Sequence, residues 1–104
     1  MPTLITIYWR DIPAQVMAKQ GRQRTRHKLS DRFHVGIDRA AMRAKKINAD
    51  AYLDDWHRET VKIGGQMEAL VAARAEELES AYSDERLEVI IKNKGLEPTL
   101  QSVS

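Results

Sequence analysis

The first twenty residues alternate between apolar and polar side chains, which is the pattern of half-buried β-strands. Residues 3–10 are rich in β-branched and aromatic side chains, and their apolar side chains recur at every second position. Residues 14–20 alternate in the same way, so we expect a second strand antiparallel to the first. Pro13 has no backbone N–H and restricts the residue before it, and we therefore expect the turn between the strands at residues 11–13.

Helical spacing replaces this alternation further along the chain. An apolar stripe with the period of an α-helix covers residues 33–44. Ser30 stands shortly before this stripe, and we expect it to be the N-cap residue of the first helix. A short second helix is expected over residues 48–56, where it would carry Tyr52 and Trp56.

The second half of the chain adds one strand and two helices to the prediction. Residues 60–63 read as a half-exposed strand that ends at a pair of glycines. Residues 66–82 carry the longest apolar stripe and are expected to form a helix. Ser83 is a second expected helix cap, and the short helix after it is expected to end with Gly95 directly beyond its last turn.

The resulting order, β-β-α-α-β-α-α, indicates an α+β fold: a small antiparallel sheet of about three strands with helices packed on one face. A chain of 104 residues has room for one domain. We expect residues 1–97 to form this domain and residues 98–104 to be a flexible C-terminal tail.

The composition excludes several classes of protein and of functional site. No run approaches the roughly 18 consecutive apolar residues of a membrane helix, and the first residues lack the basic segment and cleavage site of a secretory signal. The chain has no cysteine, which excludes disulfides, thiolate metal ligands and a cysteine nucleophile. We therefore expect a cytoplasmic protein that does not contact a membrane.

The net charge of +2 hides an uneven distribution along the chain. Residues 1–46 carry a net charge of +8, whereas residues 47–104 carry −6. Such a split indicates either a basic surface for a polyanion or two halves that attract each other within one fold. We favour the second interpretation, because a domain of this size must fold both halves against each other.

The densest basic segment places a cation at every second position: Arg22, Arg24, Arg26 and Lys28. An extended backbone would bring all four side chains to one face, where they suit phosphates or another anionic partner. The alternative is a solvated hairpin arm or loop. No aromatic residue interleaves with the cations, so the stacking platform of proteins that bind single strands is not visible here.

No pattern of catalytic or metal-binding residues stands out. The three histidines are far apart in the sequence, no serine lies in a nucleophile motif, and the two adjacent glycines form no phosphate loop. Two aromatic–charged clusters remain, Tyr8-Trp9-Arg10 and the segment that ends at Trp56. We expect both tryptophans in the core; exposed together with Tyr8 and Arg10, they would instead form a partner surface.

The run from Ile7 to Val16, Ile-Tyr-Trp-Arg-Asp-Ile-Pro-Ala-Gln-Val, carries a resemblance to a known family. Together with residues 32–33, 37–42 and 50–56, it resembles the small bacterial "virulence factor" domain family, frequent in alphaproteobacteria. The resemblance covers about residues 3–90. Members of this family often stand beside genes for corrinoid methyltransferases, methylenetetrahydrofolate reductase and related demethylation enzymes, and the resemblance brings no catalytic residues with it.

The resemblance implies a non-catalytic accessory or interaction protein, a small subunit of a tetrahydrofolate- or corrinoid-linked one-carbon enzyme system. Such a subunit would meet tetrahydrofolate or a corrinoid through a larger enzyme, with the basic arm against an acidic surface or an anionic cofactor tail. The alternative is a nucleic-acid-binding module that uses residues 22–28. A third hypothesis is a small enzyme with a site around Arg10 and Asp11, and the apolar faces of the last two helices could also serve a homodimer.

Overall fold

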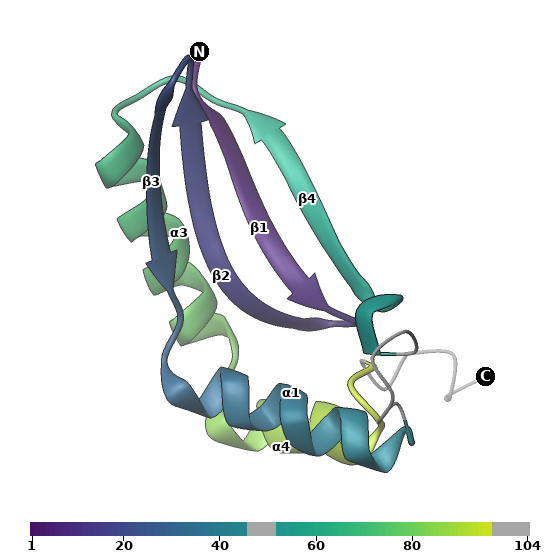
Figure 1. The fold of residues 1–104 in the computed structure, drawn as a ribbon. Helices are drawn as coiled ribbons and strands as arrows, with labels where there is room; N and C mark the ends of the chain where they lie inside the picture. The colour runs from purple at the N-terminus through teal and green to yellow at the C-terminus, as the bar shows by residue number, and fades with distance from the viewer. Residues whose placement is uncertain (46–51, 97–104) are drawn as a thin grey trace, which may run out of the picture.

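The computed structural model of the chain describes residues 1–45 and 52–96 and has a four-stranded antiparallel sheet in the order β3-β2-β1-β4 (Figure 1). The predicted α+β class is therefore confirmed. The strands are β1 (Thr3–Trp9), β2 (Ile12–Gln20), β3 (Gln23–Lys28) and β4 (Trp56–Lys62). The helices are α1 (Asp31–Arg43), α3 (Met67–Ala81) and α4 (Asp84–Lys92).

Two expectations reach beyond the described residues. The tail expected at residues 98–104 lies outside them, and so does much of the helix expected over residues 48–56. Trp56 itself is described, and it begins β4 instead of ending a helix.

The first hairpin turns earlier than its proline indicated. Arg10 and Asp11 form the turn, and β2 already begins at Ile12 and includes Pro13. The strand tolerates Pro13 because β3 pairs with β2 only from Gln15 onward, so Pro13 has no hydrogen-bonding neighbour on that side. The register of β1 against β2 also shifts at this point, between Ile7 and Tyr8.

The sheet has one strand more than predicted, because the basic arm is itself the edge strand β3. The opposite edge strand, β4, is also longer than the segment 60–63 that the pattern indicated. Apart from Trp56, every side chain of β4 is exposed, so the strand carries no apolar alternation that would mark its start. Its position is set by pairing with β1 along its full length.

The core lies between one face of this sheet and α3, and it continues towards α1 and α4 at one end of the sheet (Figure 1). The small side chains Ala14, Val16 and Ala18 of β2 are buried on the face that α3 covers. Helices α1 and α4 pack side by side, and Gly36 makes the close approach feasible, since a Cβ there would lie 3.0 Å from Ile91 Cδ1. The predicted apolar stripes of α1, α3 and α4 supply the buried residues of all three helices.

The two expected serine caps behave differently. Ser83 caps α4, because its hydroxyl accepts a hydrogen bond from the backbone N–H of Arg86 at 3.1 Å. Ser30 is the N-cap residue of α1, as predicted, but its side chain makes no capping hydrogen bond. The hydroxyl and backbone N–H of Ser30 both donate to the carboxylate of Glu79, at 2.9 and 2.8 Å, and thereby join α1 to α3.

The end of α4 is tied to the turn of the first hairpin. Lys94, at φ 64°, takes the left-handed position that was expected for Gly95, and Gly95 follows it at φ 88°. The N–H of Gly95 donates to the carbonyl of Ile90 at 2.8 Å, which closes the helix in a Schellman motif. A Cβ on Gly95 would lie 2.7 Å from Cζ3 of Trp9, so this glycine is required by both its backbone angle and its neighbour.

Replacing Gly95 by alanine should therefore lower the free energy of unfolding by about 2–4 kcal/mol, from backbone strain and overpacking against Trp9 together. Gly21 is the matched control, because it also has a positive φ (62°), whereas a Cβ there would meet no atom within 4 Å. Gly21→Ala should cost only the backbone strain, about 1 kcal/mol. Urea unfolding of the two variants checks this order, and equal losses would contradict the packing role of Gly95.

Candidate binding face of the sheet

The face of the sheet turned away from α3 collects the positive charge of the strands. Side chains alternate between the two faces of a strand, and Val16 and Ala18 of β2 lie buried on the α3 side. The pairing registers therefore assign all six Lys and Arg residues of the four strands to the other, open face. We call this surface the basic face; its cations are Lys19, Arg24, Arg26, Lys28, Arg58 and Lys62.

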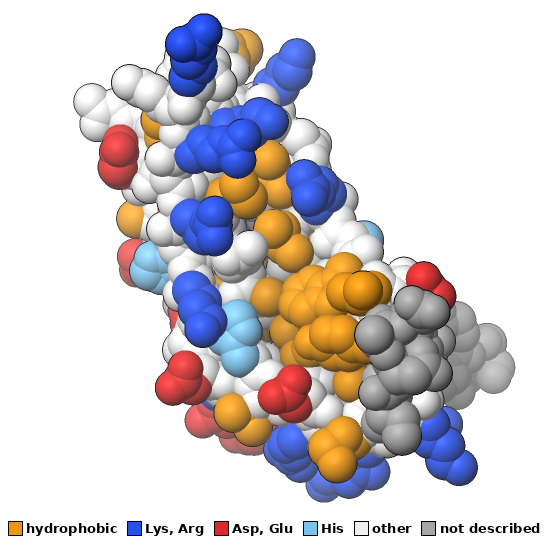
Figure 2. Space-filling model, in the orientation of Figure 1, with side chains coloured by type: hydrophobic (Ala, Val, Ile, Leu, Met, Phe, Trp, Pro, Cys, Tyr) orange, Lys and Arg blue, Asp and Glu red, His pale blue; other side chains and the backbone are white. Residues whose placement is uncertain are grey.

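Strand pairing arranges the side chains of this face in three rows that run across the sheet. Apolar side chains lie at the centre of the face. Ile5 is only 4% exposed although it lies on the face turned away from α3, between Met17 of β2 and Thr60 of β4. Ile7 and Met17 are half-buried beside it. Figure 2 shows Lys and Arg side chains on both sides of a hydrophobic strip. In the order β3, β2, β1, β4, the rows are Arg24–Lys19–Thr3–Lys62, Arg26–Met17–Ile5–Thr60 and Lys28–Gln15–Ile7–Arg58.

In the part of the chain that the structure describes, no carboxylate pairs with the cations of the basic face. Glu59 is the single acidic residue in the four strands, and it lies on the opposite face, where it accepts a hydrogen bond from Tyr8 at 3.1 Å. Within residues 1–45 and 52–96, none of the six cations forms an ion pair. The face therefore presents unpaired positive charge around an apolar centre, a combination suited to an anionic partner.

The basic residues on helices and those on strands in the first half of the chain therefore form two groups. Helical cations of the first half do pair with acids of the second half: Arg39 with Glu88 at 2.8 Å and Arg32 with Glu79 at 3.2 Å. These pairs hold α1 against α4 and α3, as expected for two halves that attract each other. The strand cations take no part in this attraction.

The structure brings together only part of the predicted anion site. Arg24, Arg26 and Lys28 lie on the basic face, whereas Arg22 lies in the turn between β2 and β3. Arg58 and Lys62 of β4 lie on the same face, at the opposite edge of the sheet. No local sequence pattern could reveal this, because β4 takes its place only by pairing with the distant strand β1.

The four residues of the expected partner surface are placed differently from one another. Trp9 is 0% exposed and its Nε1 donates to the carbonyl of Tyr52 at 2.9 Å, as expected for a core residue, and Tyr8 is 8% exposed. Neither ring is therefore accessible to a partner in this structure. Arg10 lies in the hairpin turn, where its side chain contacts Asp55 at 3.2 Å and donates to the carbonyl of Lys94 at 2.9 Å.

Trp56 is the aromatic residue that remains partly accessible. It is half-buried, and its ring packs edge-on against Tyr52 with 5.8 Å between ring centroids. Because Trp56 precedes Arg58 by two residues in β4, both side chains lie on the same face of the sheet. An aromatic ring thus borders the basic face, which the sequence pattern had not indicated.

The opposite face of β1 carries a polar network against α3. Arg74 of α3 donates to Thr6 Oγ1 at 3.2 Å and to the Tyr8 hydroxyl at 3.1 Å, and it also pairs with Glu77. Burial raises the pKa of Tyr8 to about 12, and Glu59 adds to the rise, although the positive charge of Arg74 opposes it. These groups are engaged with one another and anchor α3 to the sheet.

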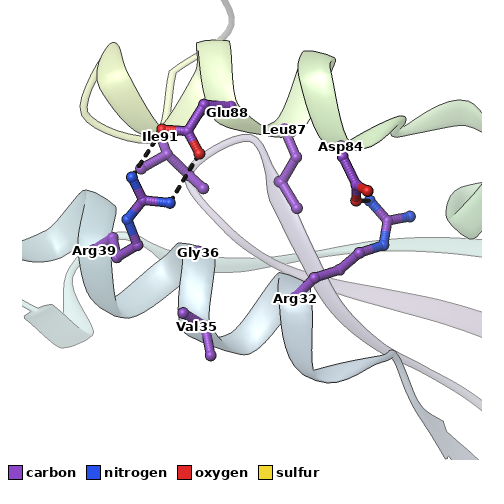
Figure 3. A pocket seen from close by; sticks show the side chains of 8 residues that line it. All are labelled: Arg32, Val35, Gly36, Arg39, Asp84, Leu87, Glu88 and Ile91. Atoms are coloured by element: carbon purple, nitrogen blue, oxygen red, sulfur yellow. Dashed lines mark hydrogen bonds and ion pairs between the residues drawn. The ribbon is translucent and has the colours of Figure 1, made fainter.

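A groove between α1 and α4 has a volume of about 210 Å³ (Figure 3). Gly36, Leu87 and Ile91 contribute its apolar lining. Arg39 pairs with Glu88 at one end and Arg32 with Asp84 at the other, and the first pair lowers the pKa of Glu88. Since these arginines are already neutralised, the groove offers a ligand little charge. Over the same residues, no three His, Asp or Glu side chains gather as metal ligands.

The raised pKa of Tyr8 predicts a specific loss of stability in alkali. The folded protein keeps this proton up to about pH 12, whereas the unfolded chain releases it near pH 10. The free energy of unfolding should therefore fall between these two pH values, by up to about 1.4 kcal/mol per pH unit from this group. Urea unfolding of Tyr8→Phe should show a shallower fall over this range than the wild type; parallel curves would contradict the burial of the phenol.

Comparison with known proteins identifies the family. No helix in the described part of the chain is long and apolar enough to cross a membrane. No curated protein and no solved structure matches the chain. Residues 7–91 match the family described as Virulence factor, from the last residues of β1 into the last turn of α4. The chain therefore belongs to the Virulence factor family.

Proposed function

We propose that this protein is a non-catalytic binding module that docks an anionic partner on its basic face. One observation carries the proposal: all six cations of the strands lie on one face, and the single carboxylate of the strands lies on the other. A charge distribution that served only solubility would need no such separation. A face of one sign also attracts an oppositely charged partner over a distance of about 8–10 Å at physiological salt.

A catalytic role has less support than binding. Around Arg10, the centre of the enzyme hypothesis, the guanidinium is already held by Asp55 and by the carbonyl of Lys94. His57 Nε2 lies 2.6 Å from the carbonyl oxygen of Arg10, so this imidazole is also engaged. These contacts tie the hairpin turn to neighbouring segments and leave Arg10 a structural role.

Within this proposal, the family membership suggests an accessory subunit of a larger enzyme. In that version the basic face docks on an acidic surface of a tetrahydrofolate- or corrinoid-dependent one-carbon enzyme, or holds an anionic cofactor tail such as polyglutamate. Its support is the family resemblance together with the sign of the face. Recovery of such an enzyme from the host by the wild-type chain, and not by a variant of the basic face, is its test.

Polyanion binding itself is tested with two triple variants of equal net charge. Arg24→Gln/Arg26→Gln/Arg58→Gln neutralises the basic face, and Arg43→Gln/Lys45→Gln/Lys92→Gln neutralises exposed cations on and near α1 and α4. On a heparin column, the first variant should elute at clearly lower NaCl than the wild type, because phosphate- or sulfate-type contacts release counterions. The second variant should elute close to the wild type.

Elution of the two variants at the same salt would contradict the proposal, since only the total charge would then matter. Thermal unfolding serves as the control for folding. None of the three basic-face residues forms an ion pair within the described part of the chain, so their replacement should leave the melting temperature within a few degrees of wild type.

A further inference from the structure

We propose that the anionic partner of the basic face is an extended single strand of nucleic acid. The inference rests on the proposed function and names its ligand. Three features of the face carry it: a regular row of cations along one edge, an apolar strip beside that row, and a half-buried aromatic ring across the strip.

The row of cations follows β3. Arg24, Arg26 and Lys28 occupy alternate positions of a regular strand and are therefore about 6.8 Å apart. This is close to the separation of successive phosphates in an extended nucleic-acid strand. Lys19 lies beside Arg24 in the paired strand β2, and it adds a further charge at one end of the row. The sugar–phosphate backbone would accordingly run along β3.

The apolar strip explains why the strand should be single. Met17 lies directly beside the cation row, and Ile5 and Ile7 lie one strand further along the sheet, where the bases of a backbone on β3 would reach. In a duplex the bases are stacked inside and would leave this strip without a contact. Helix α3, the longest described helix, packs on the opposite face of the sheet and is therefore not placed to enter a major groove from this face.

Residues of β4, at the opposite edge of the face from β3, can contact the bases. Trp56 and Arg58 lie on the same face of β4, across the strip from β3. Strands β3 and β4 are three strand spacings apart, about 14 Å. A base splayed from the backbone towards β4 could stack on the exposed part of the Trp56 ring or on the planar guanidinium of Arg58.

The test compares a fluorescent (dT)15 oligonucleotide with a 15-base-pair duplex, each titrated with the full chain by fluorescence anisotropy. The proposal predicts at least tenfold tighter binding of (dT)15 and a linear fall of log K with log salt. Arg24→Gln/Arg26→Gln should reduce that slope by about 1.4, which is about 0.7 for each phosphate contact with a single strand. Arg43→Gln/Lys92→Gln, of equal charge, should leave the slope unchanged.

Tryptophan emission of the wild-type chain tests the aromatic part of the proposal, and the variant Trp56→Phe is its control. Trp9 is fully buried, so quenching by (dT)15 would come from Trp56, and Trp56→Phe should abolish most of it. Binding of (dT)15 that is no tighter than binding of the duplex, or that is unaffected by Arg24→Gln/Arg26→Gln, would overturn the inference.

The outcome also separates this inference from the proposed function. Poly-L-glutamate, an acidic polypeptide without bases, is titrated in the same way as a third probe. If the basic-face variant loses binding to polyglutamate while (dT)15 binds no better than duplex, the nucleic-acid inference fails and polyanion docking stands. If neither probe responds to the variant, both proposals fail.

Discussion

The pairing register of β1 with its two neighbours is the constraint on which both faces of the sheet depend. A shift of one residue would turn Ile5 and Ile7 towards α3 and would bring Thr6 and Tyr8 to the open side. The register is held at one end of the sheet, where Trp9 pairs with Ile12 and Trp56 and packs against Gly95 after α4. The buried tryptophan thus fixes where the cations of the sheet lie, although it contacts no partner itself.

The register also keeps the cations of the strands on the side of the sheet opposite helix α3. Among the helices, ion pairs such as Arg39 with Glu88 join segments about fifty residues apart and contribute to one fold. Each exposed pair of this kind contributes little to the free energy of folding, about 1 kcal/mol or less. On the basic face the cations lack such partners within the described residues, which leaves their field available for binding.

The sequence pattern predicted the fold class and those elements whose burial is one-sided. The alternation in β2 and the apolar stripe of α3 are visible because each element buries one face against the core. In β1 the alternating residues Ile5 and Ile7 lie on the face turned away from α3, and Leu4, Thr6 and Tyr8 are buried on the helical side. The start of β4 at Trp56 was missed because both faces of that edge strand are open to solvent beyond its first residue. Three of the six cations of the basic face could be predicted from the period of two in β3. Lys19 joins them from the neighbouring strand β2, whereas Arg58 and Lys62 join them only because β4 pairs with β1, which is distant in sequence.

The central claim, that the basic face is the binding surface of this protein, is tested most directly by mapping the contact residue by residue. Backbone amide signals of the ¹⁵N-labelled chain would be followed by NMR while (dT)15 or polyglutamate is added at physiological salt. We predict that the largest shifts cluster in β2, β3 and β4, around Met17, Arg26 and Arg58, with little change in α1 and α4. Shifts concentrated in the groove between α1 and α4, or spread evenly over the surface, would contradict it.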